Sequence, residues 1–167
     1  SSPLPEPPSD ATNQYADDPH AAELGRSLFF DPRLSGNGEV SCATCHQPDL
    51  WFADGLKKSK GLGTADRHAP TLVDAAHHRW FNWDGRSDSM WGHTIRPIEN
   101  PLEMGGDRTM LARLVLEDQT LKNRYQAIFG AIPLSISDLP ATARPVGDSD
   151  SVEAWERLTP IDQDRIN

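Results

Sequence analysis

The segment Ser41-Cys42-Ala43-Thr44-Cys45-His46 contains the only two cysteines of this 167-residue chain. A disulfide between residues three positions apart closes almost no loop and adds little stability. A disulfide scaffold is therefore excluded, and both thiols are free for chemistry. On one helical turn, this spacing presents two sulfurs along one edge with the imidazole directly after them.

This C-x-x-C-H pattern is typical of covalent haem attachment. Cys42 and Cys45 are predicted to add to the two vinyl groups of one haem c, and His46 to be the proximal ligand of the haem iron. Attachment through thioethers needs reduced thiols and normally takes place outside the cytoplasm. We therefore expect a periplasmic protein.

Two other uses of the thiols compete with haem. A structural zinc site needs four ligands, usually with a second cysteine pair, and the chain has no such pair. Histidines downstream could in principle complete a zinc site: His68, His77, His78 and His93. A thioredoxin-like redox pair needs a βαβ context, which the sequence pattern does not indicate.

The composition also favours a bound cofactor. Hydrophobic residues make up 37% of the chain, and Pro 14 and Gly 12 indicate long loops. A chain so lean in apolar residues needs something else to fill its interior. Aromatic residues are frequent near the motif, which favours a haem pocket over a packed sheet. These are Trp51, Phe52, Trp80, Phe81, Trp83 and Trp91.

The formal charge of −9 argues against nucleic acid or an anionic membrane surface as partner. No apolar run approaches the roughly 18 residues of a membrane span. Residues 1–9 have neither a basic region nor an apolar core, so a signal peptide is not expected. A mature exported protein would have such a beginning, and so would a cytosolic protein with an irregular N-terminal tail.

We predict a mainly α, cytochrome c-like helical domain whose long loops wrap around a covalent haem. The hydrophobic spacing and the capping residues predict helices over 20–30, 70–78, 86–96, 107–117 and 119–129. Residues 1–18 are predicted to form an extended arm, 19–130 the haem c domain, and 131–167 a loop and the start of a helix after Thr159. We expect that helix to lead into a C-terminal haem domain.

Two polar residues downstream of the motif attract attention. Glu103 lies in a turn beside Gly105 and Gly106, and His93 lies in a predicted helix ended by Pro97. A carboxyl group held among apolar residues has a raised pKa and suits acid–base chemistry. An ordinary solvated acid fits the pattern of Glu103 equally well. His20, His77 and His78 are expected at the surface.

A longer set of motifs resembles the N-terminal half of the bacterial di-haem cytochrome c peroxidase and MauG superfamily. The resemblance covers roughly residues 20–130. It rests on Leu24-Gly25-Arg26-Ser27-Leu28-Phe29-Phe30-Asp31-Pro32-Arg33-Leu34-Ser35, the C-x-x-C-H segment, Phe52-Ala53-Asp54-Gly55, Ala69-Pro70-Thr71-Leu72, Trp83-Asp84-Gly85-Arg86, Pro97-Ile98-Glu99-Asn100-Pro101 and Glu103-Met104-Gly105.

The resemblance implies two c-type haems in two domains, the N-terminal one reacting with peroxide. It implies that Trp83 relays electrons between the haems, that Glu103 assists O–O cleavage on the distal face, and that Pro97 lines the same pocket. His93 occupies the position of the family's distal Gln. It is therefore expected to act as an acid–base group or as a distal ligand of the iron.

Two further departures from the family pattern bear on the cofactors. Residues 47–67 contain no histidine, although related peroxidases place a displaceable ligand in this loop. The resemblance also implies an interdomain calcium ion, but His68 replaces the Asn that helps to bind it, which argues against calcium.

We therefore predict a periplasmic di-haem peroxidase-like enzyme that reacts with hydrogen peroxide and forms high-valent iron. Its electrons would come from a protein donor, or it would oxidise a side chain of a protein substrate, as MauG does. The alternative is a pure electron-transfer cytochrome. That protein would need a strong second axial ligand, for which the chain offers Met90, Met104 and Met110; the resemblance gives Met104 a structural place.

Overall fold

The computed structural model describes residues 5–166. Within this range regular structure is helical, and pairing between extended segments is limited to isolated bridges. The helices are α1 (Pro19–Phe29), α2 (Cys42–Cys45), α3 (Met90–Glu99), α4 (Arg108–Glu117), α5 (Gln119–Phe129), α6 (Ser149–Glu156) and α7 (Pro160–Ile166). The predicted mainly α class is confirmed.

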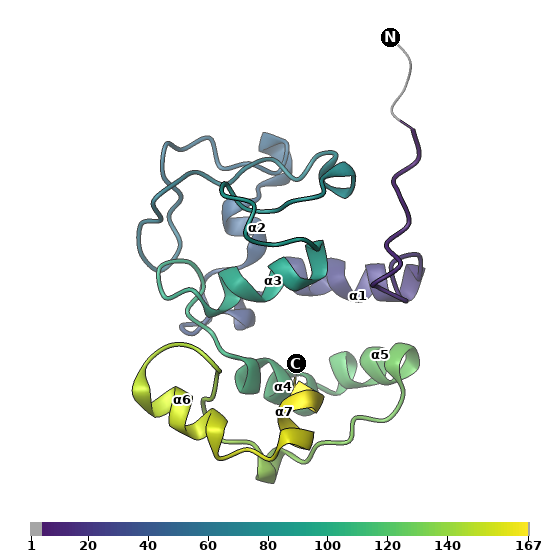
Figure 1. The fold of residues 1–167 in the computed structure, drawn as a ribbon, viewed down its shortest axis with the longest axis vertical. Helices are drawn as coiled ribbons and strands as arrows, with labels where there is room; N and C mark the ends of the chain where they lie inside the picture. The colour runs from purple at the N-terminus through teal and green to yellow at the C-terminus, as the bar shows by residue number, and fades with distance from the viewer. Residues whose placement is uncertain (1–4, 167) are drawn as a thin grey trace.

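The helices lie in two layers (Figure 1). One layer holds α1, α2 and α3 with the long loops around them, and the other holds α4 to α7. Helix α5 packs against both α4 and α1, and so joins the layers. The long loops between α1 and α3 therefore lie on the side of the molecule that carries the C-x-x-C-H motif, whereas the loop between α5 and α6 lies in the other layer.

Aspartates begin three of the predicted helices. The Asp18 side chain accepts hydrogen bonds from the backbone N–H groups of His20 and Ala21 at the start of α1. Asp107 begins α4 and Asp118 begins α5 in the same way. Each side chain satisfies backbone donors that have no partner inside the helix, a contribution of about 1 kcal/mol per cap.

A small apolar core lies behind the motif. Its buried members come from four separate segments: Leu34, Val40, Ile98 and Met104. Cys42 and Leu111 are among the partly buried side chains packed against this core. Because burying one such side chain contributes about 1.5–3 kcal/mol, the core is modest for a chain of this length.

The helix predicted over 70–78 is wrong. Only a single 3-10 turn forms there, Ala75–His77, after Asp74 in a left-handed conformation (φ 60°). Leu72 and Val73 remain exposed, so the segment has no buried apolar face to stabilise a helix.

The helix predicted over 86–96 begins and ends later than expected. Residues 81–87 form a tight turn in which Phe81 and Ser87 pair through their backbones, so α3 begins only at Met90. Pro97 lies inside the last turn of α3, which runs on to Glu99. Pro97 has no N–H to donate to the His93 carbonyl, and α3 ends two residues after it.

The ends of the chain partly follow the predictions. The arm predicted at 1–18 is described from residue 5 onwards, and residues 1–4 lie outside the described range. Tyr15 of this arm packs edge-on against Phe129 of α5, and Thr12 accepts a hydrogen bond from the Trp91 indole. Helix α7 follows Thr159, whose hydroxyl accepts from the Asp162 N–H, as its capping pattern predicts. Helix α6 has no counterpart among the predicted helices.

Candidate functional site

The C-x-x-C-H motif folds as predicted into one helical turn, α2. The Thr44 hydroxyl accepts a hydrogen bond from the Ser41 N–H at 3.0 Å, and the His46 N–H donates to the Cys42 carbonyl at 2.9 Å. Both cysteines are free thiols. The turn therefore holds the two sulfurs and the imidazole in one short, closed segment.

The imidazole of His46 has a defined tautomer. Its Nδ1 lies 3.0 Å from the carbonyl oxygen of Phe52. Because a carbonyl can only accept, Nδ1 carries the proton and Nε2 keeps a free lone pair. A metal-binding histidine is commonly oriented by such a hydrogen bond from its second nitrogen. His46 is thus prepared to bind a metal through Nε2.

The chain adopts an unusual backbone to present this carbonyl. Trp51 and Phe52 both have left-handed conformations, with φ of 57° and 58°. Such residues cost of order 1–3 kcal/mol each and persist only where the surroundings hold them. Here the Phe52 N–H donates to the Gln47 carbonyl, and the Gln47 N–H donates to the Ala53 carbonyl. Strain and hydrogen bonds together fix the orientation of His46.

The thiols do not resemble a reactive redox pair. Burial raises the pKa of Cys42, and burial with the nearby charges of Asp54 and Glu103 raises the pKa of Cys45. A thioredoxin-like nucleophile needs a lowered pKa instead.

Within the described residues, no three His, Cys, Asp or Glu side chains are arranged to hold a metal ion.

Large apolar side chains are exposed on the loops after the motif. Trp51, Trp80 and Trp83 are 77%, 65% and 57% exposed. A bound apolar group or a partner can cover surface of this kind. With two free thiols and a prepared Nε2, the residues present match what covalent haem requires.

The turn that carries Glu103 is clamped by backbone contacts from distant loops. The Leu62 N–H donates to the Glu103 carbonyl at 2.9 Å, and the Gly36 N–H donates to the Met104 carbonyl at 2.8 Å. A Cβ on Gly61 would lie only 2.8 Å from the Glu103 Cα. The loop that carries Gly61 and Leu62 therefore serves to hold Glu103 in place.

The Glu103 carboxyl group is half-buried and fixed. Its Oε1 accepts a hydrogen bond from the Asn100 amide at 2.7 Å. Burial raises the pKa of Glu103, while this hydrogen bond and the nearby His46 partly oppose the rise. Of the two roles that the sequence left open, the environment matches an acid–base group better than a solvated acid.

His93 comes from α3 and lies in the same neighbourhood. Burial lowers the pKa of His93, and the nearby Arg96 and His46 lower it further. Because His46 influences the pKa of His93 and also that of Glu103, each of these two predicted residues lies near His46, although they come from separate segments. The imidazole stacks on Phe81, with ring centroids 6.2 Å apart.

Pro97 and Trp83 take different places around this group. Pro97 follows His93 by one helical turn, and its carbonyl accepts a hydrogen bond from the Met104 N–H, which ties α3 to the Glu103 turn. Trp83 is exposed; its indole donates to the His68 carbonyl at 3.3 Å and packs edge-on against the His68 ring. Trp83 is therefore a surface residue of the described structure.

The sequence reasoning missed three positioning groups: the Phe52 carbonyl, Asn82 and Asn100. The Asn82 amide lies 3.1 Å from His93 Nδ1. A backbone carbonyl leaves no mark in a sequence. Asn100, three residues before Glu103 in a turn, could have been found from the tendency of Asn to hydrogen-bond locally.

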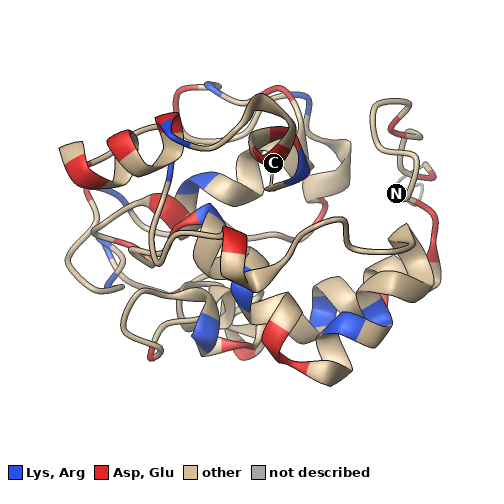
Figure 2. Cartoon of the chain, turned by 90° about the horizontal axis from the view of Figure 1, so that it is seen from below, with Lys and Arg blue, Asp and Glu red and all other residues tan. Residues whose placement is uncertain are grey.

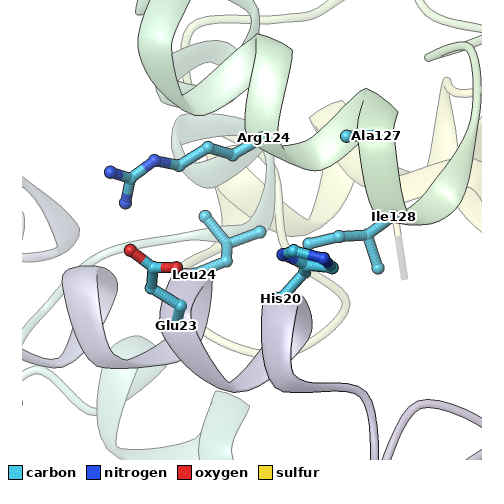
Figure 3. A pocket seen from close by; sticks show the side chains of 6 residues that line it. All are labelled: His20, Glu23, Leu24, Arg124, Ala127 and Ile128. Atoms are coloured by element: carbon cyan, nitrogen blue, oxygen red, sulfur yellow. The ribbon is translucent and has the colours of Figure 1, made fainter.

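A cavity of about 220 Å³ lies elsewhere, between α1 and α5 (Figure 3). It is lined by His20, Glu23, Leu24, Arg124, Ala127 and Ile128. Arg124 is already engaged, because it donates to the Ser27 hydroxyl at 2.7 Å. Since ligand pockets usually measure about 300–1,000 Å³, we interpret this cavity as a packing gap between helices.

Charges are spread over the molecule rather than gathered at the candidate site. Figure 2 shows acidic and basic residues interspersed along the helices and loops.

Among the described helices, none is both long and apolar enough to cross a membrane.

The helical fold and the C-x-x-C-H site together are those of the class of c-type haem domains. Residues 19–160 match the sequence profile of the di-haem cytochrome c peroxidase family. The chain belongs to this family.

Relatives and a solved structure agree with this assignment. The methylamine utilization protein MauG of Methylorubrum extorquens is 42% identical over 70% of this chain and 31% of its own length. The cytochrome-c peroxidase IdrP1 of Denitromonas iodatirespirans is 33% identical over 98% of this chain and 41% of its own length. The crystal structure of the diheme peroxidase BthA from Burkholderia thailandensis matches with a TM-score of 0.64 and 28% identity, over 74% of this chain and 36% of that one. The chain thus spans less than half the length of these relatives.

Proposed function

We propose that this chain is the haem c domain of a periplasmic di-haem oxidoreductase that reacts with hydrogen peroxide. Its electrons come from a protein donor, or it oxidises a side chain of a protein substrate. The observation that carries the proposal is that Glu103 and His93, both half-buried, each lie near His46. A pure electron carrier needs no half-buried acid–base groups at this place.

Haem c, held by Cys42, Cys45 and His46, would supply the iron that binds peroxide and takes up its two oxidising equivalents. The protein's own part is to move a proton. Glu103 takes the proton from the inner peroxide oxygen and returns it to the outer one, which then leaves as water. The hydrogen bond from Asn100 to Oε1 leaves Oε2 free for this transfer.

His93 supports the same step as a neutral imidazole, because its lowered pKa keeps it uncharged near neutral pH. Pro97 supports the position of Glu103, because its carbonyl joins α3 to the Glu103 turn. A positioned general acid–base group contributes about 10²–10⁴ in rate. We ascribe a rate contribution of this size to Glu103 and His93 together.

Trp83 is proposed to pass an oxidising equivalent out of this domain. It is 57% exposed, and its indole is oriented by the hydrogen bond to His68. We place the C-terminal haem domain, with the second haem, opposite this side chain. The domain division at 19–130, with 131–167 leading onwards, belongs to the same proposal. Because His68 packs on Trp83, it is not arranged as a calcium ligand, and no calcium is proposed.

The competing electron-transfer function needs a second strong ligand. Met104 is 3% exposed within the apolar core, which disfavours it as that ligand. Two other candidates for the second ligand are Met90, which is exposed at the first turn of α3, and the imidazole of His93.

The resting spectrum and the reaction with peroxide of the full-length holoprotein test the proposal. We expect high-spin ferric haem and rapid loss of the resting Soret band on stopped-flow mixing with hydrogen peroxide. Purely low-spin haem that does not react with peroxide would contradict the proposal and favour the electron carrier.

A further inference from the structure

A tight turn brings one amide side chain against the imidazole of His93. Phe81 and Ser87 close this turn through backbone hydrogen bonds of 2.8 and 3.4 Å. Inside it, Asn82 adopts a left-handed conformation with φ of 67°. The Asn82 Nδ2 lies 3.1 Å from His93 Nδ1 and 3.2 Å from the Ser87 hydroxyl oxygen.

The orientation of the Asn82 amide, with Nδ2 toward both His93 Nδ1 and the Ser87 hydroxyl oxygen, determines which nitrogen of His93 carries the proton. An amide nitrogen has two hydrogens and no acceptor site, so both neighbours of Nδ2 must accept. His93 Nδ1 is therefore an acceptor, and in a neutral imidazole the proton is then on Nε2. The other amide hydrogen goes to Ser87, which is buried. The two donors of Asn82 are both used.

Asn suits this position for two separate reasons. Its short polar side chain makes it one of the few non-glycine residues that adopt a left-handed backbone readily. It also supplies two donors from one atom. Phe81 adds a third constraint, because its ring lies nearly parallel to the imidazole, at 15°. Ring orientation and tautomer of His93 are thus set from the same short turn.

We infer that Asn82 is a positioning residue that holds His93 as the Nε2–H tautomer, so that His93 stands at the site as a hydrogen-bond donor and not as an iron ligand. This inference rests on the proposed function. Nδ1 is occupied by the amide, and Nε2 has no lone pair to give. The group that His93 could then bind is an oxygen acceptor, such as peroxide or water, next to the haem that Cys42, Cys45 and His46 would hold.

The variant Asn82→Asp tests the inference in the full-length holoprotein. A carboxylate can only accept, so His93 must place its proton on Nδ1, and Nε2 gains a lone pair. We expect the high-spin absorption and electron paramagnetic resonance signals of the parent to give way to low-spin, bis-histidine signals. The double variant Asn82→Asp/His93→Gln should lose those low-spin signals.

Asn123→Asp is the matched control, because Asn123 is exposed on α5 and its oxygen already accepts from Gln119. It should keep the parent's spectrum. If Asn82→Asp does not fold, Asn82→Gly, which tolerates the left-handed backbone, replaces it. That variant removes the donor and should raise the low-spin fraction above that of the parent.

Two results would overturn the inference. One is an Asn82→Asp spectrum identical to those of the parent and Asn123→Asp. The other is a parent that is already low-spin and loses that signal in His93→Gln. Slow or absent reaction with peroxide in a parent with the expected spectra would instead count against the proposed function alone.

Discussion

Glu103 is the residue on which the proposed proton transfer depends most directly. Glu103→Gln keeps the shape of the side chain and its hydrogen bond from Asn100 but cannot carry the proton. We expect the reaction with peroxide to slow by about 10²–10⁴, with the haem still attached. Stopped-flow measurement of the Soret band provides the rate. His93→Gln is the companion variant and should cost much less; equal rates for Glu103→Gln and the parent would make Glu103 a structural turn residue.

The raised pKa of Glu103 also predicts how stability varies with pH. Burial makes the folded protein hold this proton more tightly than the unfolded chain does. A carboxyl group shifted in this direction costs no stability below its ordinary pKa, and its cost grows as pH rises through the raised value. As the pH rises above about 4, the ordinary pKa of a glutamate, the free energy of unfolding of Glu103→Gln should therefore increase relative to that of the parent. Denaturant titrations of both holoproteins measure it; a constant difference would contradict the shift.

At the scale of elements, the loop after the motif acts as a clamp on the Glu103 turn. Gly61→Ala would drive a methyl group into the backbone of Glu103, and neither backbone can move without breaking the Leu62–Glu103 hydrogen bond. We expect a loss of about 1–3 kcal/mol in unfolding free energy, as for other overpacked sites, and a slower reaction with peroxide. Denaturant unfolding and stopped-flow rates measure the two effects.

Gly25→Ala is the matched control for this substitution. Gly25 lies in α1, and a Cβ there meets nothing within 4 Å. Because alanine favours the helix, this variant should be more stable by about 0.5–1 kcal/mol with an unchanged rate. If Gly61→Ala behaves like Gly25→Ala, the clamp does not hold Glu103.

At the scale of the whole molecule, the small core and the exposed aromatic loops predict that the fold depends on covalent haem. The intact mass of this chain should exceed its sequence mass by one haem, and the excess should survive denaturation. Cys42→Ala/Cys45→Ala should lose the haem and much of its helical circular dichroism. Protein with the bare sequence mass and native helicity would contradict both the cofactor and its structural role.

Local interactions explain what could be predicted from the sequence. The turn Cys42–Cys45, the caps at Asp107 and Asp118 and the helix after Thr159 each depend on hydrogen bonds between residues at most four apart. Such bonds form whatever the rest of the chain does, so residue types and spacing suffice to predict them. The attachment motif belongs to this group, since its chemistry lies within one turn.

Contacts between distant segments were decided only by the tertiary structure. The meeting of Gly61 with Glu103, and of Asn82 with His93, joins residues that are neighbours in space but not in sequence. The predicted helix over 70–78 failed for the same kind of reason, because no partner buries Leu72 and Val73. Local preference is worth tenths of a kcal/mol per residue, whereas burial and packing contribute several times more for each side chain, so the packed whole determines where each loop lies.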